Sequence, residues 1–350
     1  MSWFFNKNDE PPIPSGPLQA FGMESHEYWD HIKSDVQVIL QELRSNFRHM
    51  TELRLGFKML GDAELEFLGA ALTVNRTLTK LSLEMNHFGD EGVAFLVDGL
   101  KDHGALTLLD LHGNKNMTCV GAASVAVLLR ASRTVIAEVS LGGVDIGCIG
   151  AAHLASALKM NTSVRCLSLT GTGLGDAGVA SLAEALTVNR VLRELYISGN
   201  DIGDMGALGL AEALKAESAH VLTVLALERN CIGDEGAVGL AEALGGHNAT
   251  SITRLTLSQN TVGDAGAASM AHALEGNSTL KQLALSGNRI GDMGASHIAD
   301  ALRTNVTLTH LRLGQNVFGE TGEAALAAVV SISSVNTALL VDVDPAITRL

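Results

Sequence analysis

The sequence predicts an elongated α/β solenoid, in which a curved parallel β-sheet forms the concave side and helices lie on the convex side. Three observations indicate this fold class. A spacing of 28 or 30 residues returns through ten units, the apolar pattern changes from strand-like to helix-like within each unit, and the chain is 47% apolar but only 4% aromatic. Because repeat chains grow along one axis, 350 residues are compatible with one body.

Each unit begins with the pattern L-x-x-L-x-L-x-x-N, whose alternating leucines predict a short strand with one buried face. An asparagine amide can bond backbone groups of a turn that the strand leaves unpaired, so the pattern predicts a side-chain ladder between neighbouring coils. Seven units keep the asparagine, and these are Asn86, Asn114, Asn200, Asn230, Asn260, Asn288 and Asn316. In the other three units Lys58, Val144 and Thr172 take its place.

The second part of most units is a G-D-x-G turn followed by an alanine-rich segment, as in residues 203–214. In the fifth unit the apolar residues Val179, Leu182, Ala183 and Leu186 recur at i, i+3, i+4 and i+7, which predicts an amphipathic helix. No single unit could bury its apolar face alone. Stacking of the units must therefore supply the core.

Long units with N-x-I-G-D-x-G-A-x-x-L-A-x-A-L resemble the ribonuclease-inhibitor type of leucine-rich repeat, over about residues 50–334. This type also occurs in ribonuclease inhibitor, the Ran GTPase-activating protein and the sensor regions of nucleotide-binding immune receptors. The resemblance implies a leucine-rich-repeat solenoid shaped as a curved horseshoe. It also implies protein binding along the concave sheet or the loops at its rim.

The chain divides into four predicted segments. They are an extended proline-rich arm at 1–22, an N-terminal capping helix at 23–49, ten leucine-rich repeats at 50–334 and a C-terminal cap at 335–350. The arm carries the cluster Trp3, Phe4 and Phe5. These aromatic side chains either pack back on the capping helix or anchor a partner.

The formal net charge of -14 makes nucleic acid and anionic membrane surfaces unfavourable partners, and favours a basic or neutral protein partner. The first residues contain no apolar signal-peptide core, and no later stretch reaches about 18 uncharged apolar residues. We therefore expect a cytoplasmic protein without membrane insertion.

No motif of the sequence indicates an enzyme, a cofactor or a metal site. Residues 173–178 match G-x-G-x-x-G, but Gly175, Asp176 and Gly178 belong to the turn of the repeat, and dinucleotide binding needs a doubly wound sheet. The aspartate that recurs in this turn could be imagined as a calcium ladder. Its place just before each helix instead predicts that it caps that helix.

Two of the four cysteines, Cys119 and Cys148, lie two residues before the turn glycine in adjacent units. Their separation should allow a disulfide, whereas a reducing compartment favours two free thiols.

The residues on either side of the second leucine should point out of the concave face, because strand side chains alternate. They predict a shallow groove with acidic residues toward the first half and basic residues toward the last. Since tyrosine and arginine are favoured in protein interfaces, we expect the contacts to centre on them and their charged neighbours. The candidate protein-binding residues are Asp110, His112, Tyr196, Glu228, Arg229, Arg254, His310 and Arg312.

The sequence thus predicts a non-catalytic scaffold that binds a protein partner through the concave face, the N-terminal arm or both, as a subunit of a larger assembly. The alternative, from the resemblance to the Ran-activating relative, is a GTPase-activating protein or another regulator of a small GTPase.

Overall fold

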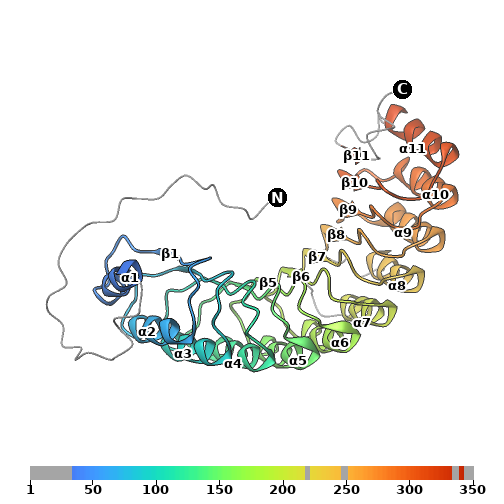
Figure 1. Ribbon diagram of the computed structural model, residues 1–350. Helices are drawn as coiled ribbons and strands as arrows, with labels where there is room; N and C mark the ends of the chain where they lie inside the picture. The colour runs from blue at the N-terminus through green and yellow to red at the C-terminus, as the bar shows by residue number, and fades with distance from the viewer. Residues whose placement is uncertain (1–33, 217–220, 246–250, 333–338, 343–350) are drawn as a thin grey trace.

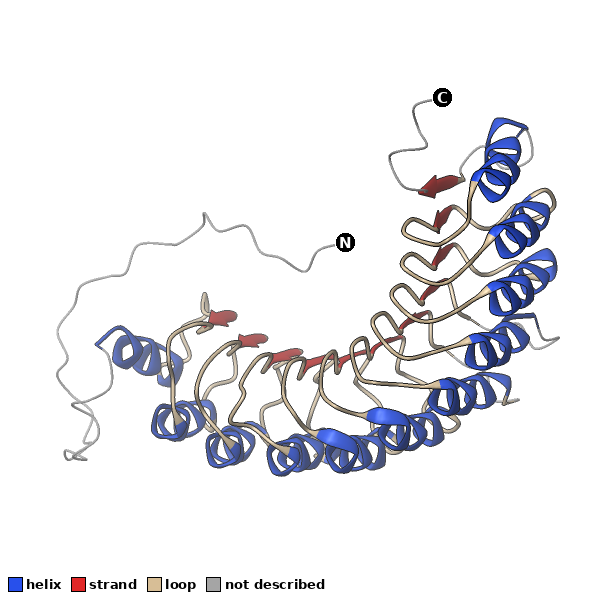
Figure 2. Cartoon of the chain, turned by 45° about the vertical axis from the view of Figure 1, so that its right-hand side comes forward, coloured by secondary structure: helices blue, strands red, loops and turns tan. Residues whose placement is uncertain are grey.

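Strands and helices alternate along the whole described chain and form one open arc, with the strands inside and the helices outside (Figures 1 and 2). The computed structural model describes residues 34–216, 221–245, 251–332 and 339–342. The strands are β1 (Glu52–Arg54), β2 (Lys80–Ser82), β3 (Leu108–Asp110), β4 (Glu138–Ser140), β5 (Cys166–Ser168), β6 (Glu194–Tyr196), β7 (Val224–Ala226), β8 (Arg254–Thr256), β9 (Gln282–Ala284), β10 (His310–Arg312) and β11 (Leu340–Asp342).

One helix precedes the first strand, and one helix follows each strand from β1 to β10. The helices are α1 (Ser34–Arg44), α2 (Asp62–Leu72), α3 (Asp90–Leu100), α4 (Cys119–Arg130), α5 (Gly147–Leu158), α6 (Gly175–Leu186), α7 (Asp204–Lys215), α8 (Asp234–Gly245), α9 (Asp264–Gly276), α10 (Asp292–Leu302) and α11 (Glu320–Ile332). Helix α1 lies in the segment expected to cap the first coil. The arm at 1–22, with Trp3, Phe4 and Phe5, lies outside the described residues.

The sheet is parallel throughout, and its strands follow each other in chain order from β1 to β11. The register places the central residue of each strand beside that of the next, from Leu53 and Leu81 at one end to Leu311 and Val341 at the other. The solenoid expected from the repeat, with a concave parallel sheet and convex helices, is confirmed.

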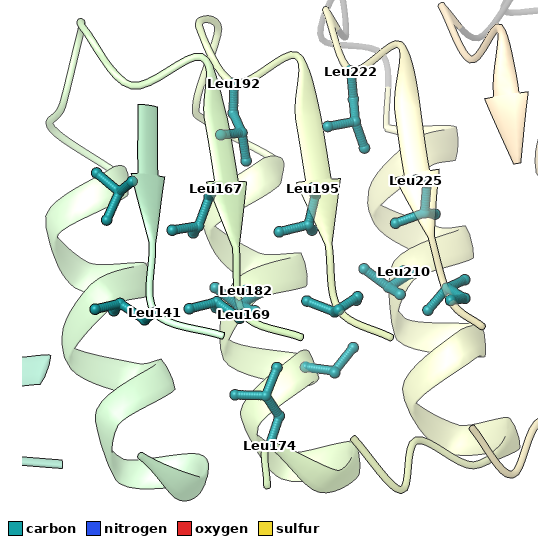
Figure 3. Close-up of a cluster of buried hydrophobic side chains, with 14 of the residues drawn as sticks. Leu141, Leu167, Leu169, Leu174, Leu182, Leu192, Leu195, Leu210, Leu222 and Leu225 are labelled. Atoms are coloured by element: carbon teal, nitrogen blue, oxygen red, sulfur yellow. The ribbon is translucent and has the colours of Figure 1, made fainter. Parts of the chain in front are cut away.

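The core lies between the sheet and the helices, where leucines of the two walls meet (Figure 3). In the coil that contains β6, Leu192, Leu195 and Ile197 are fully or almost fully buried. On α7, Leu210 faces them from the opposite wall and Ala211 lies beside it, both with no exposed surface. Alanine on the inner helix face lets neighbouring helices stack closely, which explains why so large an apolar content needs so few aromatic residues.

The predicted asparagine ladder is present on the turns after β2, β3 and β6 to β10, whose units carry the asparagine. Asn230 is representative: its Oδ1 accepts the N–H groups of Asn200 (2.8 Å) and Ile202 (3.2 Å), and its Nδ2 donates to the carbonyls of Ile197 (3.2 Å) and Leu227 (2.9 Å). Three of these four groups belong to the preceding coil. Each asparagine therefore satisfies buried backbone groups and joins two coils at once.

The recurring aspartate forms a second ladder, and the expectation that it caps its own helix is wrong. Asp176 accepts the N–H groups of Gly203 (2.7 Å) and Gly206 (3.0 Å), which begin helix α7 in the next coil. A side chain already inside the first helical turn cannot reach back to its own N–H groups, whereas those of the stacked helix lie beside it. The same paired bonds are made by Asp62, Asp90, Asp204, Asp234, Asp264 and Asp292.

This second ladder explains the last glycine of G-D-x-G. A Cβ atom on Gly206 would lie 2.6 Å from Oδ1 of Asp176 and 2.7 Å from Cγ2 of Ile202. Only glycine leaves room for the carboxylate of the preceding coil.

Candidate protein-binding surface

The concave face consists of the first and third side chains of the three-residue strands, which point away from the core. The central residue of each described strand from β1 to β10 is buried, and its neighbours are more exposed in most strands. Strand β7 is an exception, because Val224 and Ala226 are each only 7% exposed. The outward side chains of this strand are therefore largely covered by their neighbours.

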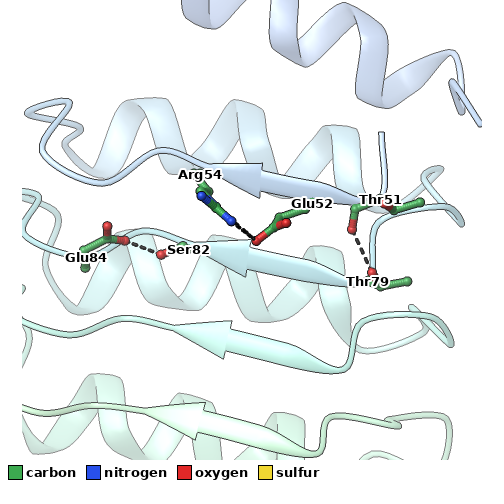
Figure 4. Close-up of polar contacts among 6 residues, drawn as sticks. All are labelled: Thr51, Glu52, Arg54, Thr79, Ser82 and Glu84. Atoms are coloured by element: carbon green, nitrogen blue, oxygen red, sulfur yellow. Dashed lines mark hydrogen bonds and ion pairs between the residues drawn. The ribbon is translucent and has the colours of Figure 1, made fainter. Parts of the chain in front are cut away.

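Polar contacts at the first strands hold several charged side chains in place (Figure 4). The Arg54 guanidinium makes an ion pair with Glu52 at 2.9 Å, and the Ser82 hydroxyl donates to Glu84. These charges are thus partly engaged within the chain.

Strands β3–β6, which we call the acidic half, present Asp110, Glu138 and Glu194 but no lysine or arginine. Burial raises the pKa of Asp110, although the N–H of His112, which donates to its Oδ1 at 3.0 Å, partly offsets the effect. Burial also raises the pKa of Glu138; Lys80 opposes this shift and Glu194 adds to it. Carboxylates in this half are therefore held close enough to repel each other.

Cys166 lies on β5 of this half, and Tyr196 lies on its last strand, β6. The Tyr196 hydroxyl donates to Oε2 of Glu194 at 2.7 Å, and its pKa is raised by burial and by this bond. Burial, with help from Glu194 and Glu138, raises the pKa of the Cys166 thiol to about 12. At neutral pH the thiol stays protonated, which makes it a poor nucleophile.

Strands β7–β10, which we call the arginine half, present Arg254, His310 and Arg312 but no carboxylate. Nε of Arg254 donates to Oε1 of Gln282 at 2.6 Å. In the loop after β7, Nε of Arg229 donates to Oε1 of Gln259, also at 2.6 Å. Two glutamines one coil further along therefore orient two arginines.

The structure brings some of the predicted binding residues together and separates others. Tyr196 and Arg254 lie two strands apart, which is about 10 Å across a sheet. Asp110 and its neighbour His112 lie three strands from Tyr196 toward the N-terminal end of the sheet, whereas Arg312 lies toward the C-terminal end. The predicted residues thus follow the length of the arc instead of forming one compact cluster.

Sequence reasoning missed Gln259 and Gln282, which hold the two arginines. No local signal marks the first pair. Arg229 and Gln259 take a position that is glycine in five other units, but Phe57, Met85 and Gln315 hold the same position with left-handed backbones as well. The contact follows only from the stacking of the two coils.

The described chain contains no group of three or more metal-ligating side chains and no helix long and apolar enough to cross a membrane. All four cysteines are free, including Cys119 and Cys148, so this structure contains no disulfide between them.

Comparison with known proteins identifies the repeat. A family model described as Leucine Rich repeat matches six segments, residues 74–97, 161–183, 188–211, 218–241, 248–271 and 276–299. NACHT, LRR and PYD domains-containing protein 12 of Mus musculus is 33% identical over 132 residues, which cover 37% of this chain and only 12% of that protein. The match therefore spans a small part of the relative's length.

A solved structure also shares the fold. A chain in the crystal structure of the Rad7 and Elc1 complex in yeast superposes with a TM-score of 0.51 at 15% identity, covering 91% of this chain and 89% of that one. At this identity the likeness concerns the fold alone. The matched repeats and the open sheet of stacked parallel strands give this chain the fold of a leucine-rich-repeat solenoid.

Proposed function

We propose that this protein is a non-catalytic scaffold that binds a protein partner along its concave face, as one subunit of a larger assembly. The observation that carries the proposal is the contrast between the two faces of the sheet. The inward face repeats leucine from coil to coil, whereas the outward face changes at every strand and includes tyrosine, arginine and glutamate. Varied side chains on a uniform curved frame suit recognition of one particular surface.

Two further observations support this role. The contacts of Tyr196, Arg229 and Arg254 with neighbouring polar side chains restrict their rotamers before a partner arrives, which lowers the entropy lost on binding. A fold relative also comes from a complex of two proteins, Rad7 and Elc1. The units of 28 to 30 residues, each with a full convex helix, support assignment to the ribonuclease-inhibitor type of repeat.

The N-terminal arm is a second proposed anchor, through Trp3, Phe4 and Phe5. For the location of the scaffold we propose the cytoplasm, since four free thiols suit a reducing compartment. Regulation of a small GTPase is the alternative role that the repeat resemblance suggests, and stimulated GTP hydrolysis would be its signature.

The experiment is affinity capture followed by mass spectrometry with four forms of the full chain. They are the unmodified protein, a Tyr196→Ala and Arg254→Ala variant, a form without residues 1–22, and a control with Arg130→Ala at the exposed end of helix α4 on the convex side. We expect a partner that the control retains and the concave variant loses. Equal recovery by both would contradict binding through the concave face, and loss only without residues 1–22 would assign binding to the arm.

Each captured candidate is then purified and titrated against the same four forms. Circular dichroism of every form checks that the substitutions leave the solenoid folded. Adding the candidate GTPases from the capture to a GTP hydrolysis assay tests the regulatory alternative.

A further inference from the structure

Within β3–β10 the charges of the concave face are divided between the acidic half and the arginine half, and the charged residues of β1, β2 and β11 lie outside both. The strands of the acidic half carry three carboxylates and no lysine or arginine, while the strands of the arginine half carry two arginines and no carboxylate. In a chain with a net charge of -14, a surface on which arginine outnumbers carboxylate is unexpected from composition. The local surface in this half therefore differs from the protein as a whole.

The arginines of this half are oriented without being neutralised. Arg229 and Arg254 each use Nε to bond a neutral glutamine oxygen. Within the described parts of the chain, neither these two residues nor Arg312 makes an ion pair with a carboxylate. Bonding through Nε leaves the terminal nitrogens of a guanidinium available for the two parallel bonds that a carboxylate accepts.

Two carboxylates do lie near these arginines along the chain or across the sheet. Asp342 on β11 is the register neighbour of Arg312, and Glu228 directly precedes Arg229. No ion pair joins Asp342 to Arg312 or Glu228 to Arg229. The two carboxylates therefore weaken the local positive potential without occupying the guanidinium groups.

The sheet between the arginines offers room for a chain. On the row that connects Tyr196 to Arg312, the intervening side chains are Ala226, Thr256 and Ala284. Small side chains at these positions let a ligand backbone approach the sheet.

We propose that the arginine half of the concave face binds an acidic segment of the protein partner. The inference rests on the proposed scaffold function and specifies the chemistry of its ligand. Arg254 and Arg312 lie two strands apart across the sheet and two residues apart along the strand direction, because the register mate of Arg254 on β10 is His310. Their separation of about 12 Å suits carboxylates three or four residues apart in an extended chain. The acidic half repels the same segment, so the charge division fixes where on the arc the segment lies.

The net negative charge of the whole protein does not oppose this docking strongly. At physiological ionic strength charges beyond about 8 Å are largely screened, whereas paired groups in contact are not. Contacts at the arginines therefore outweigh the distant carboxylates. The rest of the partner can still be basic or neutral, as the overall charge predicts.

The test is selection of peptides from a phage library of random dodecapeptides on the full-length protein, followed by fluorescence-anisotropy titration of the enriched peptides. Three variants are compared with the unmodified chain: Arg254→Gln with Arg312→Gln, Glu138→Gln with Glu194→Gln, and the convex control Arg130→Gln. The first pair lies in the arginine half and the second in the acidic half. Glutamine keeps most of the side-chain volume, and circular dichroism checks that each variant is folded.

We expect enriched peptides to carry a net negative charge and to bind the Arg254 and Arg312 double variant at least about tenfold more weakly, with less than about a twofold change in the convex control. The Glu138 and Glu194 variant should bind them equally or more tightly, because it removes carboxylates that repel the segment. Basic peptides weakened by the Glu138 and Glu194 changes would overturn this inference but leave the scaffold proposal standing. Peptides indifferent to both pairs would contradict both proposals. Absence of any enrichment over an unrelated protein would count against the acidic ligand.

Discussion

The regular coils and the two coils that contain β4 and β5 close the turn after their strands in different ways. In a regular coil a buried asparagine such as Asn230 satisfies the turn with its amide. In the other two coils Val144 and Thr172 stand in its place, and the N–H groups of Gly147 and Gly175 donate to carbonyls of the following coil at 3.0 Å. Both glycines have left-handed backbones, with φ of 58° and 56°.

This comparison separates the shape of the coil from the residue that stabilises it. The sheet runs through β4 and β5 without a break. The turn after β5 still receives an asparagine amide, since Oδ1 of Asn200 in the next coil accepts the N–H groups of Thr172 and Leu174. The turn after β4 has Thr172 in the next coil instead, so an asparagine is not necessary to close the turn. The irregular turns depend on backbone conformation instead of on a side-chain amide, because only glycine takes the required φ without strain. Substitutions should therefore be damaging at different residues in the two kinds of coil.

The largest effect is expected for Asn230→Ala in a regular coil. The change removes five hydrogen bonds and leaves buried backbone donors and acceptors without partners, which should lower the free energy of unfolding by about 3–5 kcal/mol. Its counterpart Thr172→Val removes one hydroxyl at the equivalent position and should cost about 1 kcal/mol. Urea denaturation followed by far-ultraviolet circular dichroism measures both, and equal losses would refute the distinction.

The next effect concerns the aspartate ladder. Gly206→Ala places a methyl group against the Asp176 carboxylate and should cost about 2 kcal/mol, because the close contact forces one of them to move. A Cβ atom on Gly209, in the same helix, would meet nothing within 4 Å, so Gly209→Ala should raise stability by up to about 1 kcal/mol. Thermal unfolding of the two variants should shift in opposite directions. A shared direction would mean that helix propensity, not the contact with Asp176, decides the outcome.

Gly175→Ala tests the backbone solution of the two irregular coils. The space around this glycine is also open to a Cβ atom, so the expected loss of about 1 kcal/mol comes only from the left-handed φ. Gly175→Asn should recover part of it, since asparagine tolerates this conformation better than alanine. If alanine and asparagine are both neutral in urea denaturation, the turn does not depend on glycine.

Most of the fold could be predicted because its signals are local and repeated. Alternation around Leu195 determines which strand residues face the core, and an asparagine at the position of Asn200 in seven of the ten units predicts a ladder. The direction of the aspartate caps could not be predicted in the same way. The spacing places Asp176 at the start of a helix, but only stacking shows that the nearest free N–H groups belong to the next helix.

The residues that face outward on the candidate surface could be predicted from the sequence, but their hydrogen-bond partners could not. Strand alternation identifies Arg254 and Tyr196 as outward residues, and both lie on the concave face. Their partners depend on packing across coils: Gln282 is 28 residues from Arg254, and its approach follows from the parallel register. The charge division into two halves was visible in the sequence, whereas the lack of ion pairs for the arginines required the structure.

The smallest expected effect lies on β4, in an irregular coil, where burial raises the pKa of Glu138 above its ordinary value. The folded protein then binds a proton at this residue more readily than the unfolded chain does. Stability contributed by this group is therefore highest below the ordinary pKa of about 4.3 and falls as the pH rises through the raised value.

Glu138→Gln removes this dependence, so it should raise the free energy of unfolding at pH 7 by a few tenths of a kcal/mol, a size limited by the partial exposure of the side chain. At about pH 3.5 the glutamate is protonated in both states, and the difference should vanish. Glu91→Gln on exposed helix α3 serves as the control for loss of one negative charge. The midpoints of urea denaturation of the unmodified protein and both variants are compared at the two pH values. A gain at Glu138 that persists in acid would show that packing, and not an unneutralised carboxylate in the acidic half, sets the stability of this strand.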